Sequence, residues 1–372
     1  MESSRLFKPL KVGTVTVQHR IAMAPLTRFR ATPEHVPTAA LAEYYGQRAS
    51  VPGTLIVTEA TFISAALGGY SRVPGLWNDE QVTAWKTVTE TVHKKGSFIF
   101  AQLWALGRAA DPKVLAQIGA QLRSSSDVPL KGTETKPVPL TEEEIEATIA
   151  QYAIAAKNAI AAGFDGVEIH GANGYLIDQF TQDVSNKRTD KWGGSIENRS
   201  RFAVEVVKAV VAAVGAEHVG IRLSPYSTFQ DMRMANPEPQ FTDLLTKIDP
   251  FKLAYIHVVE ARISGIADND GSDNIDFVYK NVSRPLIIAG GFSAESAKKL
   301  VDEDYPEKDI IVAFGRYFIS TPDLPYRLKK GIELNPYNRD TFYDWTSVEG
   351  YTGQPFSKEF LEEFPETIKS KA

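Results

Sequence analysis

Short runs of apolar residues recur along the chain and predict eight β-strands. Most of these runs are continuous in hydrophobicity rather than alternating, which is typical of parallel strands buried on both faces. The eight runs are Ile21–Pro25, Thr54–Glu59, Ser97–Trp104, Gly166–His170, Val219–Ser224, Ala254–Val259, Leu286–Ala289 and Ile310–Gly315. They indicate a large parallel α/β fold.

Stretches with helical periodicity lie between many of these strands, namely Asp79–Lys95, Thr141–Ala162, Asn198–Val214 and Ser293–Val301. The alternation of strand and helix favours a (β/α)8 TIM barrel. A doubly wound sheet is the alternative. However, no G-x-G-x-x-G motif follows the first strand, and the length suits one barrel with insertions better than two nucleotide-binding halves.

Two further segments extend the predicted barrel. Residues Lys8–Val17 predict a small hairpin that closes the barrel floor. The segment Leu106–Leu140 is rich in Ser, Gly, Lys and Pro and too long for a plain connection, so it predicts an excursion over the end of the third strand. A disordered surface insertion is the other interpretation. Because no repeat or linker divides the chain, we expect residues 1–372 to form a single domain.

The composition narrows the classes of function. The 372 residues are 43% hydrophobic and 23% charged, which is typical of a globular protein with a large core. A net charge of -5 argues against nucleic acid or an anionic membrane as the main partner. The absence of cysteine excludes disulfides, thiolate metal sites and a cysteine nucleophile. The histidines show no metal-ligand spacing, so we expect no metal.

The ends of the chain bear on its location. Residues Met1–Ser4 lack the basic start of a secretory signal, and no run approaches the roughly 20 apolar residues of a membrane span. We therefore expect a cytoplasmic protein. The last three residues, Ser370–Ala372, nearly match a peroxisomal tripeptide that ends in leucine, which leaves that address as the alternative.

Three polar side chains stand at the end of the fourth predicted strand, in the sequence His170-Gly-Ala-Asn173-Gly-Tyr175. The C-terminal ends of barrel strands carry the active sites of these enzymes, so the three groups are candidates to converge on one small molecule. The alternative is that His170 and Asn173 only satisfy backbone groups in a loop.

Other strand ends carry polar residues or glycines that suit an anionic ligand. Gly290-Gly291 and Gly315-Arg316 follow the seventh and eighth strands, where barrels commonly bind phosphate through backbone N–H groups. Simple turns are the alternative for both glycine pairs. Arg222 lies inside an apolar run, so it either pairs with a carboxylate or faces an anionic ligand. The complete set of polar strand-end residues is Thr27, Glu59, Gln102, His170, Asn173, Arg222 and Arg316.

From about Leu6 to about Phe356 the chain resembles the old yellow enzyme family of flavin-dependent ene-reductases. The matching segments are Met23–Arg28, Thr58–Ala60, Gln102–Trp104, His170–Tyr175, Gly193–Arg199, Arg222–Tyr226 and Phe314–Phe318.

The resemblance implies an FMN cofactor across the barrel mouth, with NADPH as electron donor. It places the phosphate on the glycine ends and Arg316, Thr27 at the flavin carbonyl O4, and Gln102 at the pyrimidine edge. Arg222 would lie near N1 and O2, where negative charge collects on reduction. The implied cofactor residues are Pro25, Leu26, Thr27, Ala60, Gln102, Arg222, Gly290, Gly291, Gly315 and Arg316, and Ala60 stands where many relatives have glycine.

The same resemblance implies the substrate site. His170 and Asn173 would hold the carbonyl oxygen of an α,β-unsaturated substrate as an oxyanion hole does, and Tyr175 would donate a proton to its α-carbon. Gln230 stands where some relatives have asparagine, which bears on substrate preference. The implied apolar wall consists of Tyr70, Trp104, Phe229, Phe277 and Tyr351.

We therefore expect an enzyme that uses NADPH to reduce FMN and then reduces the activated C=C bond of enals or enones. An ergot-alkaloid-type unsaturated aldehyde reductase or isomerase is the alternative within the family, and Tyr175 favours reduction because relatives with phenylalanine there favour isomerisation. Outside the family, the alternatives are a flavin-free barrel enzyme for sugar phosphates and a binding module without catalysis. We expect small-molecule partners only, and either a monomer or a homodimer.

Overall fold

The barrel is present in the computed structural model, which describes residues 3–260, 263–264, 267–268 and 273–365. Its strands pair in parallel with their neighbours, and β15 pairs with β3 to close the ring. The TIM-barrel prediction is confirmed, with a strand in each predicted run. The barrel strands are β3 (Ile21–Met23), β4 (Leu55–Val57), β6 (Phe98–Trp104), β9 (Gly166–Gly171), β10 (Val219–Leu223), β11 (Tyr255–Val259), β14 (Leu286–Ala289) and β15 (Ile310–Phe314).

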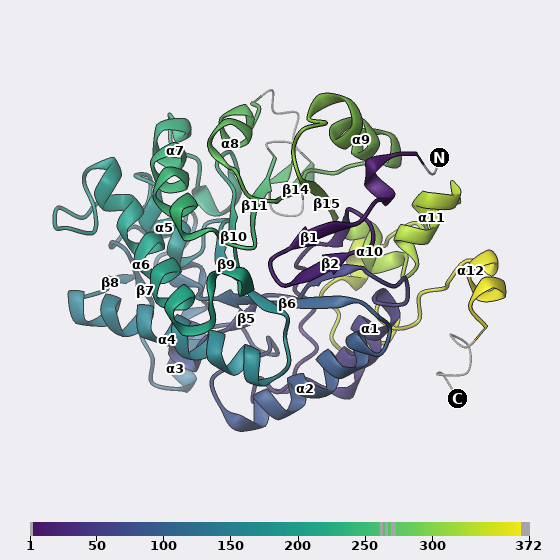
Figure 1. Ribbon diagram of the computed structural model, residues 1–372. Coiled ribbons are helices and arrows are strands. Elements are labelled where there is room, and N and C mark those ends of the chain that lie inside the picture. The colour runs from purple at the N-terminus through teal and green to yellow at the C-terminus, as the bar shows by residue number, and fades with distance from the viewer. Residues whose placement is uncertain (1–2, 261–262, 265–266, 269–272, 366–372) are drawn as a thin grey trace.

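Helices surround this ring (Figure 1). The four predicted helices are present, although α9 ends at Lys299 and continues as a π-helical turn, Leu300–Asp304. A capping box starts α4, where Thr141 Oγ1 accepts the Glu144 N–H at 3.2 Å and Glu144 Oε2 accepts the Thr141 N–H at 2.8 Å. The larger helices are α1 (Ala39–Arg48), α2 (Asp79–His93), α4 (Glu142–Ala161), α6 (Ile196–Val214) and α7 (Pro237–Ile248). The shorter ones are α3 (Pro112–Gln117), α5 (Leu176–Thr181), α8 (Asp276–Asn281), α9 (Ala294–Lys299), α10 (Arg316–Ser320), α11 (Leu324–Lys330) and α12 (Lys358–Glu363).

Alternation of side chains along the strands creates two separate cores. Outward residues such as Ile169, Ile221 and Val258 pack in one cluster with the helices. Inward residues fill the lumen of the barrel, and the apolar ones form a second cluster with the hairpin β1 (Leu10–Val12) and β2 (Val15–Val17). The hairpin therefore closes the barrel floor as predicted, and Figure 1 shows it across the centre of the ring.

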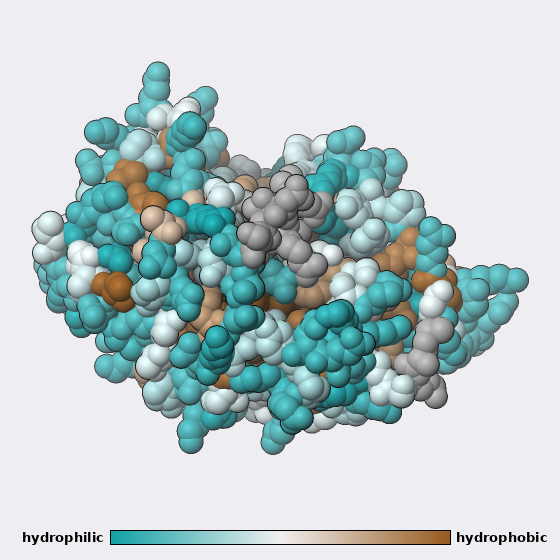
Figure 2. All heavy atoms as spheres, turned by 90° about the horizontal axis from the view of Figure 1, so that it is seen from above, coloured by the Kyte–Doolittle hydropathy of each residue, from teal (hydrophilic) through white to brown (hydrophobic). Residues whose placement is uncertain are grey.

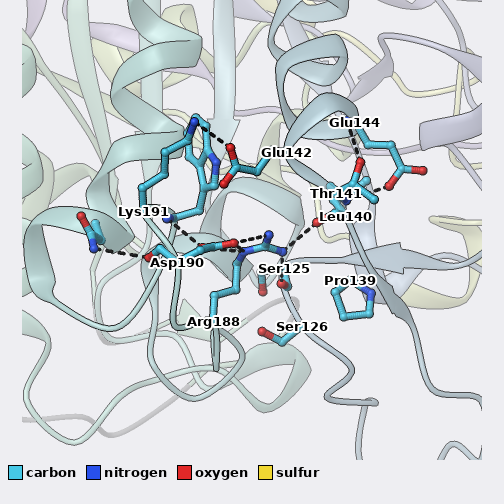
Figure 3. A network of polar contacts seen from close by, with 12 residues as sticks. Ser125, Ser126, Pro139, Leu140, Thr141, Glu142, Glu144, Arg188, Asp190 and Lys191 are labelled. Carbon is cyan, nitrogen blue, oxygen red and sulfur yellow. Dashed lines mark hydrogen bonds and ion pairs between the residues drawn. The ribbon is translucent and has the colours of Figure 1, made fainter.

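The excursion after β6 is ordered. It contains α3 and the paired strands β7 (Arg123–Ser124) and β8 (Val138–Pro139). Arg188 holds both sides of this insertion, since its Nη1 donates to the carbonyls of Ser125 at 2.9 Å and Leu140 at 2.8 Å (Figure 3). Asp190 fixes the Arg188 guanidinium through an ion pair of 2.7 Å. The predicted excursion, rather than a disordered insertion, is therefore what the structure shows.

Three smaller features complete the description. The short strand β5 (Thr61–Phe62) lies beside β6, and β12 (Ile263–Ser264) pairs with β13 (Ala267–Asp268). In the described part of the chain, no helix is long and apolar enough to span a membrane. The face drawn in Figure 2 is mainly hydrophilic, with small hydrophobic patches. The C-terminal tripeptide lies outside the described residues.

Candidate active site

A pocket opens at the C-terminal ends of the barrel strands. Each of the eight strands contributes lining residues at its end or shortly after it, so the side chains that sequence reasoning collected from distant segments meet at one place. The predicted site residues that line it are Pro25, Leu26, Thr27, Ala60, Gln102, Trp104, His170, Asn173, Tyr175, Arg222, Phe229, Gly290, Gly291, Gly315 and Arg316.

The turn after β9 presents His170, Asn173 and Tyr175 together. The Tyr175 ring packs edge-on against His170, with ring centroids 5.0 Å apart, and against Trp104 at 4.7 Å. Trp104 in turn lies nearly parallel to the His170 ring at 6.1 Å. These contacts fix the ring planes of His170 and Tyr175, because neither ring can rotate without displacing its neighbours.

Asn173 occupies the left-handed region of the backbone, with φ 58°. Its backbone N–H donates to Ser224 Oγ at 2.7 Å, and its carbonyl accepts the Gln230 Nε2–H at 3.0 Å. Asparagine tolerates this conformation better than most residues, but two hydrogen bonds from the loop after β10 are what hold it. The conformation is therefore fixed from outside the turn itself.

His170 is neutral. Burial holds its pKa well below the ordinary value, and the nearby Arg222 guanidinium and His257 lower it further. Its Nδ1 accepts the backbone N–H of Ala172 at 3.4 Å, which leaves the ring proton on Nε2. The ring is thus a neutral hydrogen-bond donor at the pocket wall.

Tyr175 is protonated. Burial raises the pKa of its phenol above the ordinary value, and Tyr70 and Tyr343 raise it further, whereas the side chain of Gln230 and the charge of Arg222 lower it. The phenol therefore carries its proton at neutral pH. Gln230 and Arg222 favour loss of that proton, but their effect on the pKa is smaller than that of burial.

Behind the pocket, the lumen holds a polar layer. The Glu168 carboxylate accepts Gln102 Nε2–H at 2.8 Å on one oxygen and the His257 Nδ1–H at 2.8 Å on the other. Arg222 lines the pocket above, and its Nε is buried without a hydrogen-bond partner among the described residues. Burial lowers the Arg222 pKa and the Glu168 charge opposes that effect. Arg222 thus faces the pocket while Glu168 balances its charge from behind.

The structure does not bring three residues of the predicted substrate wall into the pocket lining. Tyr70 packs behind Trp104 and donates its hydroxyl to the Ala109 carbonyl at 2.7 Å. Phe277 is buried on α8 against Tyr226, with ring centroids 6.3 Å apart. Tyr351 is fully buried and stacks on Tyr44 of α1 at 4.3 Å.

The polar strand-end residue Glu59 also lies outside this pocket. It is fully buried, and its carboxylate accepts the Arg28 backbone N–H at 3.2 Å and the Tyr45 hydroxyl at 3.4 Å. Burial raises its pKa to about 7. One of these partners, Tyr45, lies on α1, and the other, Arg28, also contacts the C-terminal part of the chain at the Gly350 carbonyl.

The pocket is also lined by residues that were not predicted as site residues, and two of them are aromatic residues far from any strand. Phe342 and Tyr343 reach the pocket from the segment after α11. The signal was weak, because aromatic residues in an irregular polar segment have no periodicity to interpret. The Glu168–His257 pair was missed for another reason: its partners stand on separate strands, although a charged residue inside an apolar run did mark Glu168.

No group of three or more His, Asp or Glu side chains within the described ranges is arranged to hold a metal ion. Potential ligands of the pocket are instead the backbone at its glycine ends, Arg222, Arg316 and the amide of Gln102. Such a set suits an organic anion with a hydrogen-bonding edge.

Known proteins share both sequence and fold with this chain. Residues 5–335 match the model of the "NADH:flavin oxidoreductase / NADH oxidase family". The chain is 56% identical to "Chanoclavine-I aldehyde reductase fgaOx3" of Penicillium roqueforti, over 96% of this chain and 98% of that protein. It is 50% identical to "Probable inactive dehydrogenase easA" of Claviceps fusiformis, over 98% and 97% of the two chains.

Among solved structures, the old yellow enzyme of Pichia sp. AKU4542 superposes with a TM-score of 0.89 at 41% identity, and the alignment covers 96% of this chain and 94% of that one. The fold, the residues at the strand ends and the similarity in sequence thus all indicate the same family. The chain belongs to the old yellow enzyme family of flavin oxidoreductases.

Proposed function

We propose that this protein binds FMN, takes electrons from NADPH and reduces the activated C=C bond of an α,β-unsaturated aldehyde. The observation that carries the proposal is the convergence of a neutral histidine, an asparagine and a protonated tyrosine in one pocket with Gln102 and Arg222. This pocket also supports the less specific activity on enals and enones in general.

The residues at the pocket fit a flavin nucleotide. Arg222 offers a buried guanidinium whose Nε has no partner among the described side chains. Gln102 has one N–H committed to Glu168, which leaves its carbonyl oxygen and second N–H for a ligand. Gly290, Gly291, Gly315 and Arg316 would hold the phosphate, and Pro25, Leu26, Thr27 and Ala60 would lie beside the ring system. When bound, the flavin would pass a hydride from the nicotinamide to the β-carbon of the substrate.

His170 and Asn173 would bind the carbonyl oxygen of the substrate. Negative charge grows on that oxygen as hydride reaches the β-carbon, and two preorganised neutral donors stabilise it without having to reorient. His170 supplies Nε2–H because Nδ1 is occupied by the backbone of Ala172. Asn173 would supply its side-chain amide from a backbone position that Ser224 and Gln230 hold.

Tyr175 would then donate its phenolic proton to the α-carbon. The C=C bond gains one hydride and one proton, and the phenol regains its proton from solvent. The buried ring would resist remaining as a phenolate, which favours rapid reprotonation. A protein with this donor completes the reduction rather than returning the hydride.

The aldehyde is the preferred substrate class because the Penicillium roqueforti relative, named a chanoclavine-I aldehyde reductase, is 56% identical over 96% of this chain. An apolar entrance suits a ring-bearing aldehyde: Phe229 and Tyr343 both line the pocket and remain 36% and 44% exposed. Chanoclavine-I aldehyde is accordingly the first compound to test.

The experiment compares the purified protein with its His170→Ala/Asn173→Ala variant. The wild-type protein should carry a yellow flavin that NADPH bleaches, and chanoclavine-I aldehyde or a simple enal should restore the colour with formation of the C=C-reduced product. Loss of the two donors should slow that second step at least about a hundredfold. A protein that binds flavin but reduces no enal would instead resemble its Claviceps relative named as probably inactive, and a protein that takes up no FMN would refute the proposal.

A further inference from the structure

Glu168 is a buried carboxylate that no part of the proposed reaction uses. It lies on β9 two residues before His170, so both side chains point into the lumen, with Glu168 one layer below the pocket. It is fully buried, and both of its oxygens accept hydrogen bonds, from Gln102 and from His257. Burial of a charge is costly, and these two hydrogen bonds offset that cost by holding the carboxylate against Gln102 and His257.

One consequence concerns the orientation of Gln102. A carboxylate only accepts hydrogen bonds, so it must face the amide nitrogen of Gln102 rather than the oxygen. The 2.8 Å contact therefore turns the Gln102 carbonyl away from Glu168, and this side chain lines the pocket. Without the carboxylate, the two ends of the amide would become nearly equivalent and the pocket would lose a fixed acceptor.

A second consequence concerns charge. Burial would raise the pKa of Glu168, but His257, Arg222 and Gln102 together hold it below its ordinary value, so the group is an anion. Burial and Arg222 lower the pKa of His257 although Glu168 opposes them, and the ring is a neutral donor through Nδ1. Among the described residues of this layer, the Glu168 anion behind the pocket thus balances the Arg222 cation that lines it.

We propose that Glu168 is a positioning residue that fixes the Gln102 amide and sets the net charge beneath the bound flavin. The inference rests on the proposed flavin function. Glu168 touches neither substrate nor cofactor and acts through Gln102 and Arg222. Its carboxylate makes the flavin harder to reduce than Arg222 alone would, because reduction adds negative charge above an anion.

Glu168→Gln tests this with the FMN-loaded protein. The amide has nearly the same shape, keeps an acceptor for His257 and lacks the charge. The reduction equilibrium of the bound flavin should shift toward the reduced form by about tenfold, which is about 30 mV for a two-electron couple. FMN dissociation, followed by flavin fluorescence, should become several-fold easier because the Gln102 amide is released.

Two further variants separate charge from shape. Glu168→Asp keeps the charge but is shorter, so it should weaken FMN retention while leaving the potential near the wild-type value. Glu59→Gln makes the same substitution at another fully buried carboxyl group, outside the pocket, and at pH 8, above the Glu59 pKa of about 7, it also removes a charge but should leave the potential unchanged.

Glu168→Gln strands the buried Arg222 cation, which threatens folding. The double variant Arg222→Met/Glu168→Gln removes both charges and so leaves no unpaired buried ion. Its flavin should be more easily reduced than that of Arg222→Met by a similar factor, with both variants first checked for the wild-type fold by circular dichroism. An unchanged potential and unchanged FMN retention in these comparisons would overturn the role of Glu168. A wild-type protein that does not bind FMN would overturn the proposed function and this inference with it.

Discussion

The protonation states of three buried side chains underlie the proposed chemistry. His170 is neutral and Tyr175 protonated because burial disfavours the charged form of each. Glu168 is charged despite burial because Arg222 and His257 stand next to it. Burial alone therefore does not determine the charge of a site; the neighbours that a fold brings together decide it.

Replacing Tyr175 with phenylalanine removes the proposed acid and little else, because the ring still packs on Trp104 and His170. Flavin reduction by NADPH needs no proton from Tyr175 and should stay nearly intact. Reoxidation by an enal or enone should slow by about 10² to 10⁴-fold. Nitroalkenes, whose α-carbanion is independently stabilised, should still accept hydride and stall as the nitronate.

Rapid mixing measures these two half-reactions separately. Equal slowing of both would indicate a damaged pocket rather than a lost proton donor. An enal step at the wild-type rate would show that water or another residue supplies the proton.

Glu59 makes a pH-dependent contribution to stability. Burial raises its pKa from 4.5 to about 7 in the folded protein. Below pH 4.5 the carboxyl is protonated in both states. Between pH 4.5 and about 7 the unfolded chain releases this proton and the folded protein retains it, so the free energy of unfolding falls as pH rises, by about 3 kcal/mol in total.

Glu59→Gln should remove this contribution, since the amide has no proton to lose and can still accept the Arg28 N–H. The variant should match the wild-type stability near pH 4.5 and exceed it at pH 8 by up to about 3 kcal/mol. Urea unfolding of both proteins across this range checks it. The buried Asp178, whose pKa burial also raises to about 7, is present in both and cancels in the difference. A variant less stable than wild type at pH 8 would show that attraction to the nearby arginines outweighs burial.

At the scale of elements, the segment after α11 forms one wall of the pocket and is held by an arginine–tyrosine cluster. Arg28 donates from Nε to the Phe342 carbonyl at 3.0 Å and from Nη2 to the Gly350 carbonyl at 2.8 Å. Arg48 donates to the Tyr351 carbonyl at 3.0 Å and lies over the Tyr44 ring at 3.7 Å. The backbone that carries Tyr343 into the pocket is therefore tied to the loop after β3 through Arg28, and the segment that follows it is tied to α1 through Arg48.

This arrangement separates the roles of two tyrosines. The Tyr351 hydroxyl is buried without a partner in the described part of the protein, so Tyr351→Phe should leave KM for the aldehyde unchanged and stability equal or slightly higher. Tyr343 lines the pocket and is 44% exposed, so Tyr343→Ala should raise KM for a ring-bearing aldehyde several-fold with little change for a small enal. Steady-state kinetics with both substrates measures this. A raised KM for Tyr351→Phe would mean that its hydroxyl does reach the substrate.

The strands were predictable from the sequence because parallel strands buried on both faces are continuous apolar runs. Helix α1 was not: its sequence contains Gly46, which lowers helix propensity, yet a Cβ there would stand only 2.6 Å from Thr91 Cγ2 of α2. The glycine is explained by close packing of two helices, which no local pattern reveals. Likewise, the partner that Glu168 finds in His257 is 89 residues away.

The three residues of the predicted substrate wall that lie outside the pocket also show that local sequence does not reveal which distant segments meet. Tyr351, Phe277 and Tyr70 were assigned through the family resemblance, and by composition each was equally suited to a core. Irregular segments at the barrel mouth differ in path among proteins of one fold, and their path decides which aromatic side chain faces the ligand. The strand ends, whose positions the barrel fixes, brought their polar residues to the pocket as expected, except for Glu59.

At the scale of the whole molecule, the two halves of the chain depend on each other. The N-terminal strand β3 pairs with the C-terminal strand β15, and Arg5 donates its Nη2 to the Lys308 carbonyl at 3.0 Å. The hairpin at the N-terminus packs on residues from strands β6, β11 and β15. Neither half of the barrel can bury its lumen alone, so we propose that the chain folds as a single domain and expect one cooperative transition in calorimetry.

FMN should raise that single transition as a whole, because its proposed ligands come from strands at both ends of the chain, from Thr27 after β3 to Arg316 after β15. With free FMN at about a hundred times its Kd, linkage adds about 2.7 kcal/mol, which corresponds to a rise in Tm of a few degrees for a protein of this size. Riboflavin, which lacks the phosphate, is the matched ligand and should give a smaller rise at equal concentration, whereas Arg316→Ala should reduce the difference between the two ligands. If FMN raised only one of two resolved transitions, the chain would contain two folding units; if riboflavin and FMN stabilised the protein equally, the glycine ends and Arg316 would not hold the phosphate.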